Sequence, residues 1–458
     1  MKKKQFRLAD VILSVICVVF VAEAAAPVAS IGNSQYFWWI FMIVAFLLPY
    51  GLISSELGTT YQGDGGLYDW INKAYPGTKW GARASWYYWI NFPLWMASLA
   101  VMCPSLLTTI TGAAFGTFSS LVIELAFIWI VTWIAFYPVC DSIVILNLSA
   151  AIKILLAVVV GALGVYYVSK YGFVNNMAAA TFLPSFDLNS LSYISVIIFN
   201  FLGFEVVCTY ADSMADPKKQ IPQAIVAGGI VIAAIYLFSA FGIGAAVPTS
   251  QISTDSGMVD AVSLITGKTG GFFIGTVALL FLITLFGNMI SWSMGVNSTA
   301  AYAADNGDMP RLFARRRSGN DMPIGAALAN GVVASLVCLL GVFMDAFFPN
   351  SSLFWSFFAL NLVMFLLSYL PVFPAFLKLR RDDPDTERPF RVPGSPGFLK
   401  ALAVIPMILI VVSVIFTAIP LSFDAETLRA TLPITIGSVL FLVVGEILIA
   451  VRGRHSAR

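Results

Sequence analysis

Charged residues are scarce in this sequence. Only 11% of its 458 residues are charged, whereas apolar residues make up 59% and the mean hydropathy is +0.87. A soluble globular protein carries about 25% charged residues, so the composition excludes that class. Apolar runs of about 20 residues indicate a polytopic helical membrane protein instead.

The sequence also offers little to metal, redox or enzyme chemistry. Its one histidine, His455, lies in the tail, which excludes haem and histidine-ligated metals in the membrane. Five cysteines lie inside or at the ends of apolar runs and form no CxxC pair, as is typical of buried small hydrophobic residues. No H-E-x-x-H, G-x-S-x-G or P-loop motif is present. We therefore expect no catalytic residue, no metal, no cofactor and no enzyme activity.

Hydropathy predicts an all-α membrane protein with about twelve spans. Their approximate bounds are 10–31, 36–58, 82–111, 119–138, 145–169, 191–212, 222–247, 272–302, 323–346, 352–379, 399–421 and 431–451. The basic segment Met1–Arg7 runs into the first apolar stretch with no short apolar core and small-residue cleavage site. We therefore expect an uncleaved first helix and not a signal peptide.

The distribution of basic residues predicts the orientation. An even number of spans places both termini on one side, and lysines and arginines cluster in the termini and in the loops of that side. The opposite loops hold only Lys170, Lys268 and Arg429. This bias predicts that both termini are cytoplasmic and that the protein lies in the cytoplasmic membrane of a bacterium.

Two loops on the predicted cytoplasmic side have features of their own. Residues 59–81 are too polar to span, yet Leu67, Trp70 and Ile71 recur at helical spacing. This spacing predicts a short amphipathic helix at the cytoplasmic face, with a solvated loop as the alternative. Residues 380–398 combine both signs of charge with four prolines, and we interpret them as a solvated cytoplasmic connector.

Two spans carry helix-breaking features at comparable depth. In the sixth, Gly203 precedes Glu205; glycine costs about 1 kcal/mol relative to alanine in a helix, and a carboxylate at mid-membrane about 2.5–3.5 kcal/mol. In the first, Glu23 precedes Pro27, which removes a backbone donor. Because a half-helix start offers free N–H groups, such paired breaks point to a transporter site. The alternative is a packing glycine beside a glutamate that is paired inside the bundle.

Several short motifs follow one another along nearly the whole chain. They are PVASIG at 27–32, PYGL at 49–52 with Glu56, GGLYDW at 65–70, GFE at 203–205, DPKKQIP at 216–222, and SW at 291–292 through ADNGDMP at 304–310. With these motifs the sequence resembles the amino acid–polyamine–organocation (APC) transporters, and most of all the bacterial glutamate/GABA and arginine/agmatine exchangers. Each motif is weakly specific, and their order makes the set specific.

The resemblance implies a leucine-transporter-like fold of twelve helices. Its 5+5 inverted repeat, with broken helices 1 and 6, would cover residues 1–171 and 191–379. A cytoplasmic connector at 380–398 and two C-terminal helices with a short tail at 399–458 would follow. The family's glycine-rich break in span 1 is replaced here by Ala22, Glu23, Ala24, Ala25 and Ala26. Because backbone groups can still contact substrate where this helix unwinds, these five residues are substrate-binding candidates.

The resemblance implies further substrate-binding residues in spans 3, 6 and 8. Trp292 matches an aromatic residue that lines the substrate site, where it can stack over a cation. Phe199 resembles a gating aromatic residue, and it precedes the break at Leu202, Gly203 and Phe204. Packing or lipid-facing positions are the alternative for both aromatic residues.

Asn91, Phe92 and Met96 occupy positions that contact the far end of the substrate in arginine/agmatine exchangers. Phe92 and Met96 make that end less polar here, which argues against arginine. Against this stands Glu23, which can pair with an amine.

Four residues are candidates for coupling or gating. Lys153 is the one basic residue inside a span, and it resembles the lysine whose ammonium takes the place of sodium in related transporters. It can bridge carbonyls of the span 1 break and hydroxyls of span 8, for which Ser298 and Thr299 are candidates. Snorkelling to the cytoplasmic interface is the alternative. We expect Glu205 either to respond to pH or to hold the span 6 break.

The sequence therefore predicts a secondary active transporter of amino acids or related amines that works by alternating access, without sodium. Amino acid/amine antiport is preferred, proton-coupled symport is an alternative, and a non-transporting receptor is an alternative of another class. The expected partners are a small-molecule amino acid or amine, membrane lipid and, for symport, protons, with no nucleic acid. Monomer and homodimer both stay open.

Overall fold

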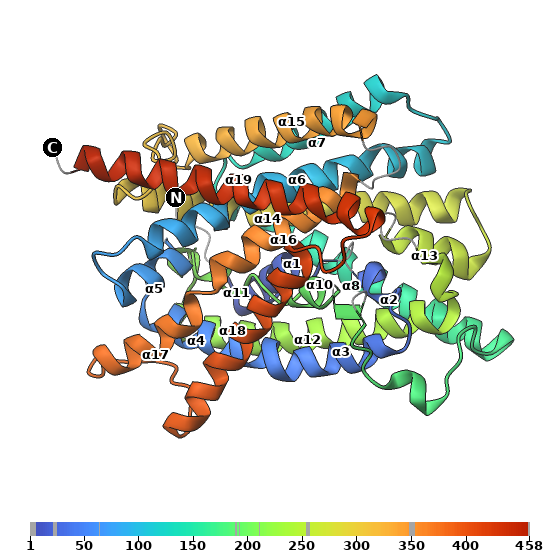
Figure 1. Cartoon of the computed structure of the whole chain (residues 1–458), viewed down its shortest axis with the longest axis horizontal. Coiled ribbons are helices and arrows are strands. Elements are labelled where there is room, and N and C mark those ends of the chain that lie inside the picture. Colours follow the sequence, from blue (N-terminus) through green and yellow to red (C-terminus); the bar gives the residue numbers. More distant parts are fainter. Residues whose placement is uncertain are drawn as a thin grey trace.

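Long helices running side by side along the longest dimension of the molecule form the bundle (Figure 1). The computed structural model describes residues 6–21, 25–63, 65–187, 190–191, 193–209, 211–252, 257–347 and 353–456. Eight single helices in this part of the chain are long and apolar enough to contain a span. They are α6 (Trp80–Thr111), α7 (Thr117–Ile134), α8 (Val139–Tyr171), α12 (Pro217–Ala246), α14 (Phe272–Asp305), α15 (Ile324–Phe347), α18 (Pro396–Ala418) and α19 (Ala425–Ser456).

Two more spans are continuous but irregular, and prolines explain both irregularities. The second span consists of α3 (Ser34–Met42), the π-helical turn η2 (Ile43–Leu47) and α4 (Leu48–Thr60). Pro49 lacks the N–H that would bond one turn back, so the hydrogen bonds shift register before it. The tenth span consists of α16 (Leu353–Tyr369) and α17 (Val372–Asp382), with Pro371 at the joint.

The first and sixth spans are each split into two short helices. Their halves are α1 (Leu8–Val19) with α2 (Ala25–Ala29), and α10 (Ile194–Phe199) with α11 (Phe204–Cys208). These breaks confirm the sequence prediction, and with the ten longer spans they account for the twelve predicted ones. In Figure 1, α1, α10 and α11 lie in the middle of the bundle.

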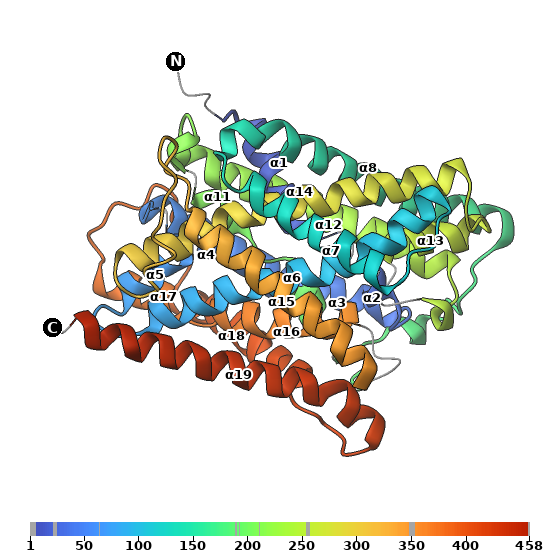
Figure 2. The same ribbon diagram turned by 90° about the horizontal axis from the view of Figure 1, so that it is seen from above.

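One end of the bundle carries α5 (Leu67–Ala74), α17, the end of α19 and the start of α1, and we call it the terminal face (left in Figure 1 and Figure 2). Helix α5 is the amphipathic helix predicted within residues 59–81. Its Leu67, Trp70 and Ile71 are buried against the protein, which contacts them mainly through α6 and α17. The opposite end carries α2 and α13 (Gly257–Thr266).

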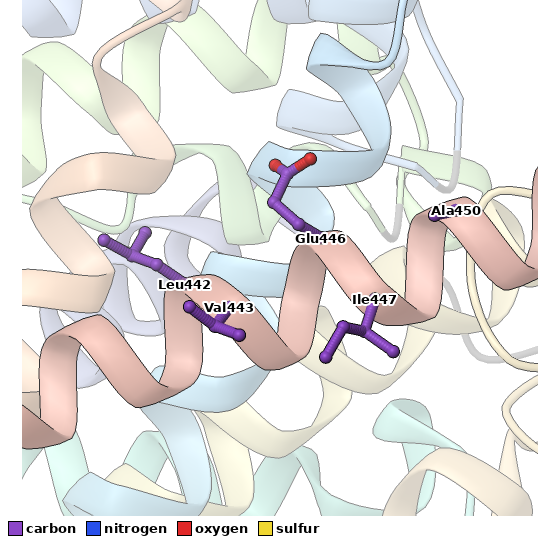
Figure 3. A pocket seen from close by; sticks show the side chains of 5 residues that line it. All are labelled: Leu442, Val443, Glu446, Ile447 and Ala450. Atoms are coloured by element: carbon purple, nitrogen blue, oxygen red, sulfur yellow. The ribbon is translucent and has the colours of Figure 1, made fainter.

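The outer helices present apolar side chains on their free surfaces, as a membrane-embedded bundle requires. On α19, Ile436 is 64% and Ile447 is 56% exposed. Figure 3 shows Ile447 on the side of α19 away from the Glu446 carboxylate. Glu446 accepts a bond of 2.5 Å from Nε of Arg83 on α6, so this carboxylate of span 12 is paired within the bundle.

Candidate functional site

The break in the sixth span depends on Gly203. Its φ is +120°, a conformation that residues with a Cβ rarely adopt. A Cβ here would lie 2.7 Å from the Trp292 ring and 2.8 Å from a Val18 methyl group. The glycine therefore allows the chain to turn between α10 and α11 while α1 and α14 pack directly against it.

Tyr50 of α4 caps the helix that restarts after this turn. Its hydroxyl accepts hydrogen bonds of 3.2 Å from the amides of Gly203 and Phe204, and donates to Glu205. No side chain at the N-cap position of α11 forms such a bond. A residue from another span thus pairs donors that a helix start leaves without partners.

Glu205 collects hydroxyl groups from three spans. Besides Tyr50, Tyr88 of α6 donates to its Oε1 at 2.7 Å and Tyr369 of α16 donates to the same oxygen at 2.5 Å. Glu205 is 1% exposed. An ionised carboxylate accepts only, and three phenolic donors match it. The Glu205–tyrosine cluster, as we call these four residues, joins spans 2, 3, 6 and 10 on the terminal side of the breaks.

The break in the first span exposes carbonyl oxygens that other helices pair. The ammonium of Lys153 on α8 donates to the carbonyls of Cys17 and Phe20 at 2.7 and 2.6 Å. Nε1 of Trp292 donates to the carbonyl of Val18 at 2.8 Å. The negative, C-terminal end of the α1 dipole also stabilises a cation at this position. Lys153 is fully buried, which argues against snorkelling to the interface.

An aromatic cluster lies between the two breaks. The ring centroids of Trp292 lie 5.5 Å from Trp95 and 5.2 Å from Phe365. Phe199 lies 5.0 Å from Trp95, 5.4 Å from Phe365 and 5.2 Å from Phe358. The structure thus brings the predicted Trp292 and Phe199 together. Aromatic faces attract cations, so the cluster can receive a positively charged group.

Two buried amides flank this aromatic cluster. Asn91 and Asn361 donate from Nδ2 to carbonyls one turn back, those of Tyr88 and Phe358. Their Oδ1 atoms are buried and have no hydrogen-bond partner. By helical spacing, Asn91 shares a face of α6 with Trp95, and Asn361 shares a face of α16 with Phe358 and Phe365. The site therefore offers two carbonyl-type acceptors beside aromatic rings.

The other predicted substrate contacts lie in several parts of the structure. Phe92 and Met96 are buried on α6, and Leu202 is buried within the sixth-span break. Phe204 stacks on Tyr50 at 5.4 Å, away from the aromatic cluster. Ala26 is buried in α2, where Ala25 begins the helix. Ala22, Glu23 and Ala24 lie outside the described residues.

The hydroxyls of span 8 lie in two different parts of the structure. Thr299 lies toward the terminal face, where a Cβ on Gly66 would come 3.5 Å from its Oγ1, and its neighbour Ser298 is half-buried. Ser291, with Ser149, lies against the Cys17 thiol, close to the carbonyl that Lys153 bonds. The roles given to Ser298 and Thr299 stay predictions.

Sequence reasoning missed Ser291, Asn361 and the three tyrosines of the Glu205–tyrosine cluster. A lone asparagine in the apolar run of 353–369 was a usable signal for Asn361, because polar side chains inside spans are often functional. Tyr50 lies in the PYGL motif at 49–52, but Tyr88 and Tyr369 gave no such signal, and the convergence of the three depends on how their separate spans pack.

Comparison with known proteins identifies the family. Residues 6–445 match the family model described as "Amino acid permease". A "Probable agmatine/putrescine antiporter" of Lactococcus lactis is 62% identical over 98% of this chain and 95% of its own length. A "Probable polyamine transporter" of Arabidopsis thaliana is 23% identical over 87% of this chain and 77% of its own length. A "Glutamate/gamma-aminobutyrate antiporter" of Lactococcus lactis is 19% identical over 82% and 76%.

These matches confirm the APC resemblance, and the motifs that carried it all lie within the matched region. They agree with the broken first and sixth helices. The chain therefore belongs to the amino acid permease family, and it is an integral membrane transporter and not an enzyme.

Proposed function

We propose that this protein exchanges agmatine for putrescine, or for a closely related diamine, by sodium-independent antiport. The observation that carries the proposal is the pairing of two partnerless amide oxygens with aromatic faces between the helix breaks. The relative that is 62% identical is described as a probable agmatine/putrescine antiporter, which supports the same choice of substrate.

The chemistry of the site suits a substrate that is cationic at both ends. Ammonium and guanidinium groups donate hydrogen bonds and accept none. Oδ1 of Asn91 and Oδ1 of Asn361 supply acceptors, while Trp292 and Phe365 supply ring faces. The methylene chain of a diamine would contact Phe199 and Met96, both of which are buried. An amino acid would bring a carboxylate, for which these groups provide no donor.

We assign the second cationic end of the substrate to Glu23. This residue lies two positions before the start of α2 in the sequence and brings a carboxylate into the stretch that replaces the family's glycine-rich break. Glu205 is not a substrate ligand in this scheme, because three phenols already donate hydrogen bonds to its carboxylate. Agmatine and putrescine both carry two positive charges at neutral pH, so one-for-one exchange moves no net charge.

The proposed transport cycle uses the Glu205–tyrosine cluster as the barrier toward the cytoplasm. The excess of basic residues in the termini and adjoining loops supports a cytoplasmic terminal face. The cluster lies between that face and the aromatic cluster, so release into the cytoplasm requires its hydroxyl bonds to open. We assign the motion to spans 1, 2, 6 and 7 rocking against the remainder of the two repeats, 1–171 and 191–379.

Counterflow in proteoliposomes tests the proposal. Vesicles loaded with unlabelled putrescine should accumulate labelled agmatine at pH 7.5 without sodium, and vesicles loaded with arginine or glutamate should not. Uptake should be unchanged when valinomycin and potassium impose a membrane potential. Uptake driven only by a proton gradient would refute antiport in favour of symport, and a sodium requirement would refute the role of Lys153.

A further inference from the structure

We propose that Glu56, Arg380 and Arg388 form an ion-pair latch that holds the terminal face closed and must open in each transport cycle. The three residues lie at the seam between α4 and α17. Glu56 belongs to a family motif, and residues 380–398 were predicted to be a solvated connector. Neither feature has a role in the substrate site.

The connector is folded tightly onto the end of α17. The Arg388 guanidinium donates to the carbonyls of Leu379 and Asp383 at 3.2 and 2.8 Å, and so pairs groups that the end of α17 leaves open. Arg380 donates to the carbonyl of Val392 at 2.7 Å. Helix α17 and residues 383–392 are therefore one unit, and the solvated interpretation does not hold for Arg388, whose side chain is 6% exposed.

A single carboxylate of α4 enters this unit. Glu56 receives two hydrogen bonds from Arg380, one to each oxygen, and Nε of Arg388 lies 3.3 Å from its Oε1. The amide of Val392 donates to its Oε2 at 2.7 Å. The Glu56 side chain is 2% exposed. Near the surface, Tyr61 adds one bond across the seam, donating to Asp383 at 2.9 Å.

The same seam continues inward to the substrate gate. Tyr50 and Glu56 lie on one helix, six residues or about 9 Å apart along its axis. On the other side of the seam, Tyr369 and Arg380 belong to one span. A movement of α4 relative to span 10 withdraws Tyr50 from Glu205 and Tyr369, and the same movement separates Glu56 from Arg380. The latch and the Glu205–tyrosine cluster are thus two layers of one gate.

Charged groups suit a contact that opens repeatedly. Buried ions attract each other strongly, but they lose hydration, so the net gain over the separated and hydrated state is modest. An apolar contact of the same area would instead expose apolar surface to water each time it opened. The ion pairs can therefore hold the face closed without making the open state inaccessible.

Crosslinking distinguishes a latch from a permanent staple. Glu56→Cys and Arg388→Cys are combined in a background whose five native cysteines are replaced, and are bridged with a short reducible bis-thiosulfonate. We expect the bridge to reduce putrescine-driven agmatine counterflow by about tenfold or more, with recovery on reduction, because an open state is required in every cycle. The same reagent should not change the counterflow of either single-cysteine variant relative to that variant before treatment. Full transport by the bridged protein would overturn the proposal.

A second measurement uses milder variants and does not need transport. Cys208 of α11 lies just inside the seam, where its Sγ would be 2.4 Å from a Cβ on Gly58 of α4. With Cys208 as the only cysteine, Arg388→Gln should accelerate its labelling by an impermeant maleimide from the terminal face by about tenfold. Arg83→Gln, which breaks the pair with Glu446 away from the seam, should not. Equal labelling of folded, monodisperse Arg388→Gln and parent proteins would overturn the latch even if the double-cysteine protein cannot be produced.

Discussion

Replacing Asn361 by leucine should change stability and substrate affinity in opposite directions. Oδ1 of Asn361 is buried without a partner, and leaving such a group unsatisfied costs about 1–3 kcal/mol. Leucine has a similar shape and no polar atom, so Asn361→Leu should raise the free energy of unfolding by part of that amount. The same change removes an acceptor for the substrate cation, and a charge-assisted bond contributes about 1.5–3 kcal/mol. The KM for agmatine should therefore rise about 10- to 150-fold.

Two assays on purified protein check this prediction. Thermal unfolding in detergent gives Tm without substrate and its increase with saturating putrescine, and counterflow gives KM. Asn330→Leu on α15 is the matched control. Oδ1 of Asn330 is also buried without a partner, but Nδ2 of Asn330 donates to Oδ1 of Asn297 at 2.6 Å, so leucine here leaves the Asn297 oxygen unsatisfied. This variant should lower Tm and leave KM unchanged. A lower Tm for Asn361→Leu with an unchanged KM would show that Asn361 is structural and would refute the reasoning.

Two other predictions concern the sixth-span break and the rim of the latch. Gly203→Ala should abolish counterflow and reduce the yield of folded protein, because alanine would have to adopt a φ of +120° and place its Cβ 2.7 Å from Trp292. Gly397 has open space around it, so Gly397→Ala should change neither measurement. Normal transport by Gly203→Ala would contradict the assigned geometry. Burial and the bond to Asp383 raise the pKa of Tyr61 to about 12, from 10. A pKa raised by folding adds stability that is complete below about pH 10 and is lost as the pH rises through about 12. The pH profiles of counterflow for Tyr61→Phe and the parent protein should therefore superimpose between pH 5.5 and 8.5, and a displaced profile would mean that another titrating group depends on Tyr61.

Hydropathy and local backbone chemistry were sufficient to predict the fold. Apolar runs predicted the spans, and the positions of Gly203 and Pro27 predicted both breaks, because these features depend on residues that are close together in the sequence. The helix around Leu67 and Trp70 was predictable for the same reason. The π-helical turn before Pro49 was missed, since proline requires a local adjustment without specifying which one.

The side-chain networks were not predictable in the same way. Trp292 was singled out through its motif, yet its bond to the carbonyl of Val18 depends on how α14 packs against α1. Tyr88 and Tyr369 are separated by 281 residues and meet on one carboxylate oxygen. Nothing in the charge pattern of residues 380–398 indicated that Arg388 would turn back onto α17. Such contacts depend on tertiary packing, and a single sequence carries no direct record of it.

The position of Lys153 also bears on the energy source of transport. The cation that bridges the Cys17 and Phe20 carbonyls is covalently part of the chain. It cannot dissociate into either compartment, so its attraction to those carbonyls draws no work from an ion gradient. Under the proposed one-for-one antiport, the direction of net flux is set by the concentration ratios of the exchanged solutes on the two sides of the membrane. A cell that consumes one solute and produces the other would drive the exchange through its own metabolism.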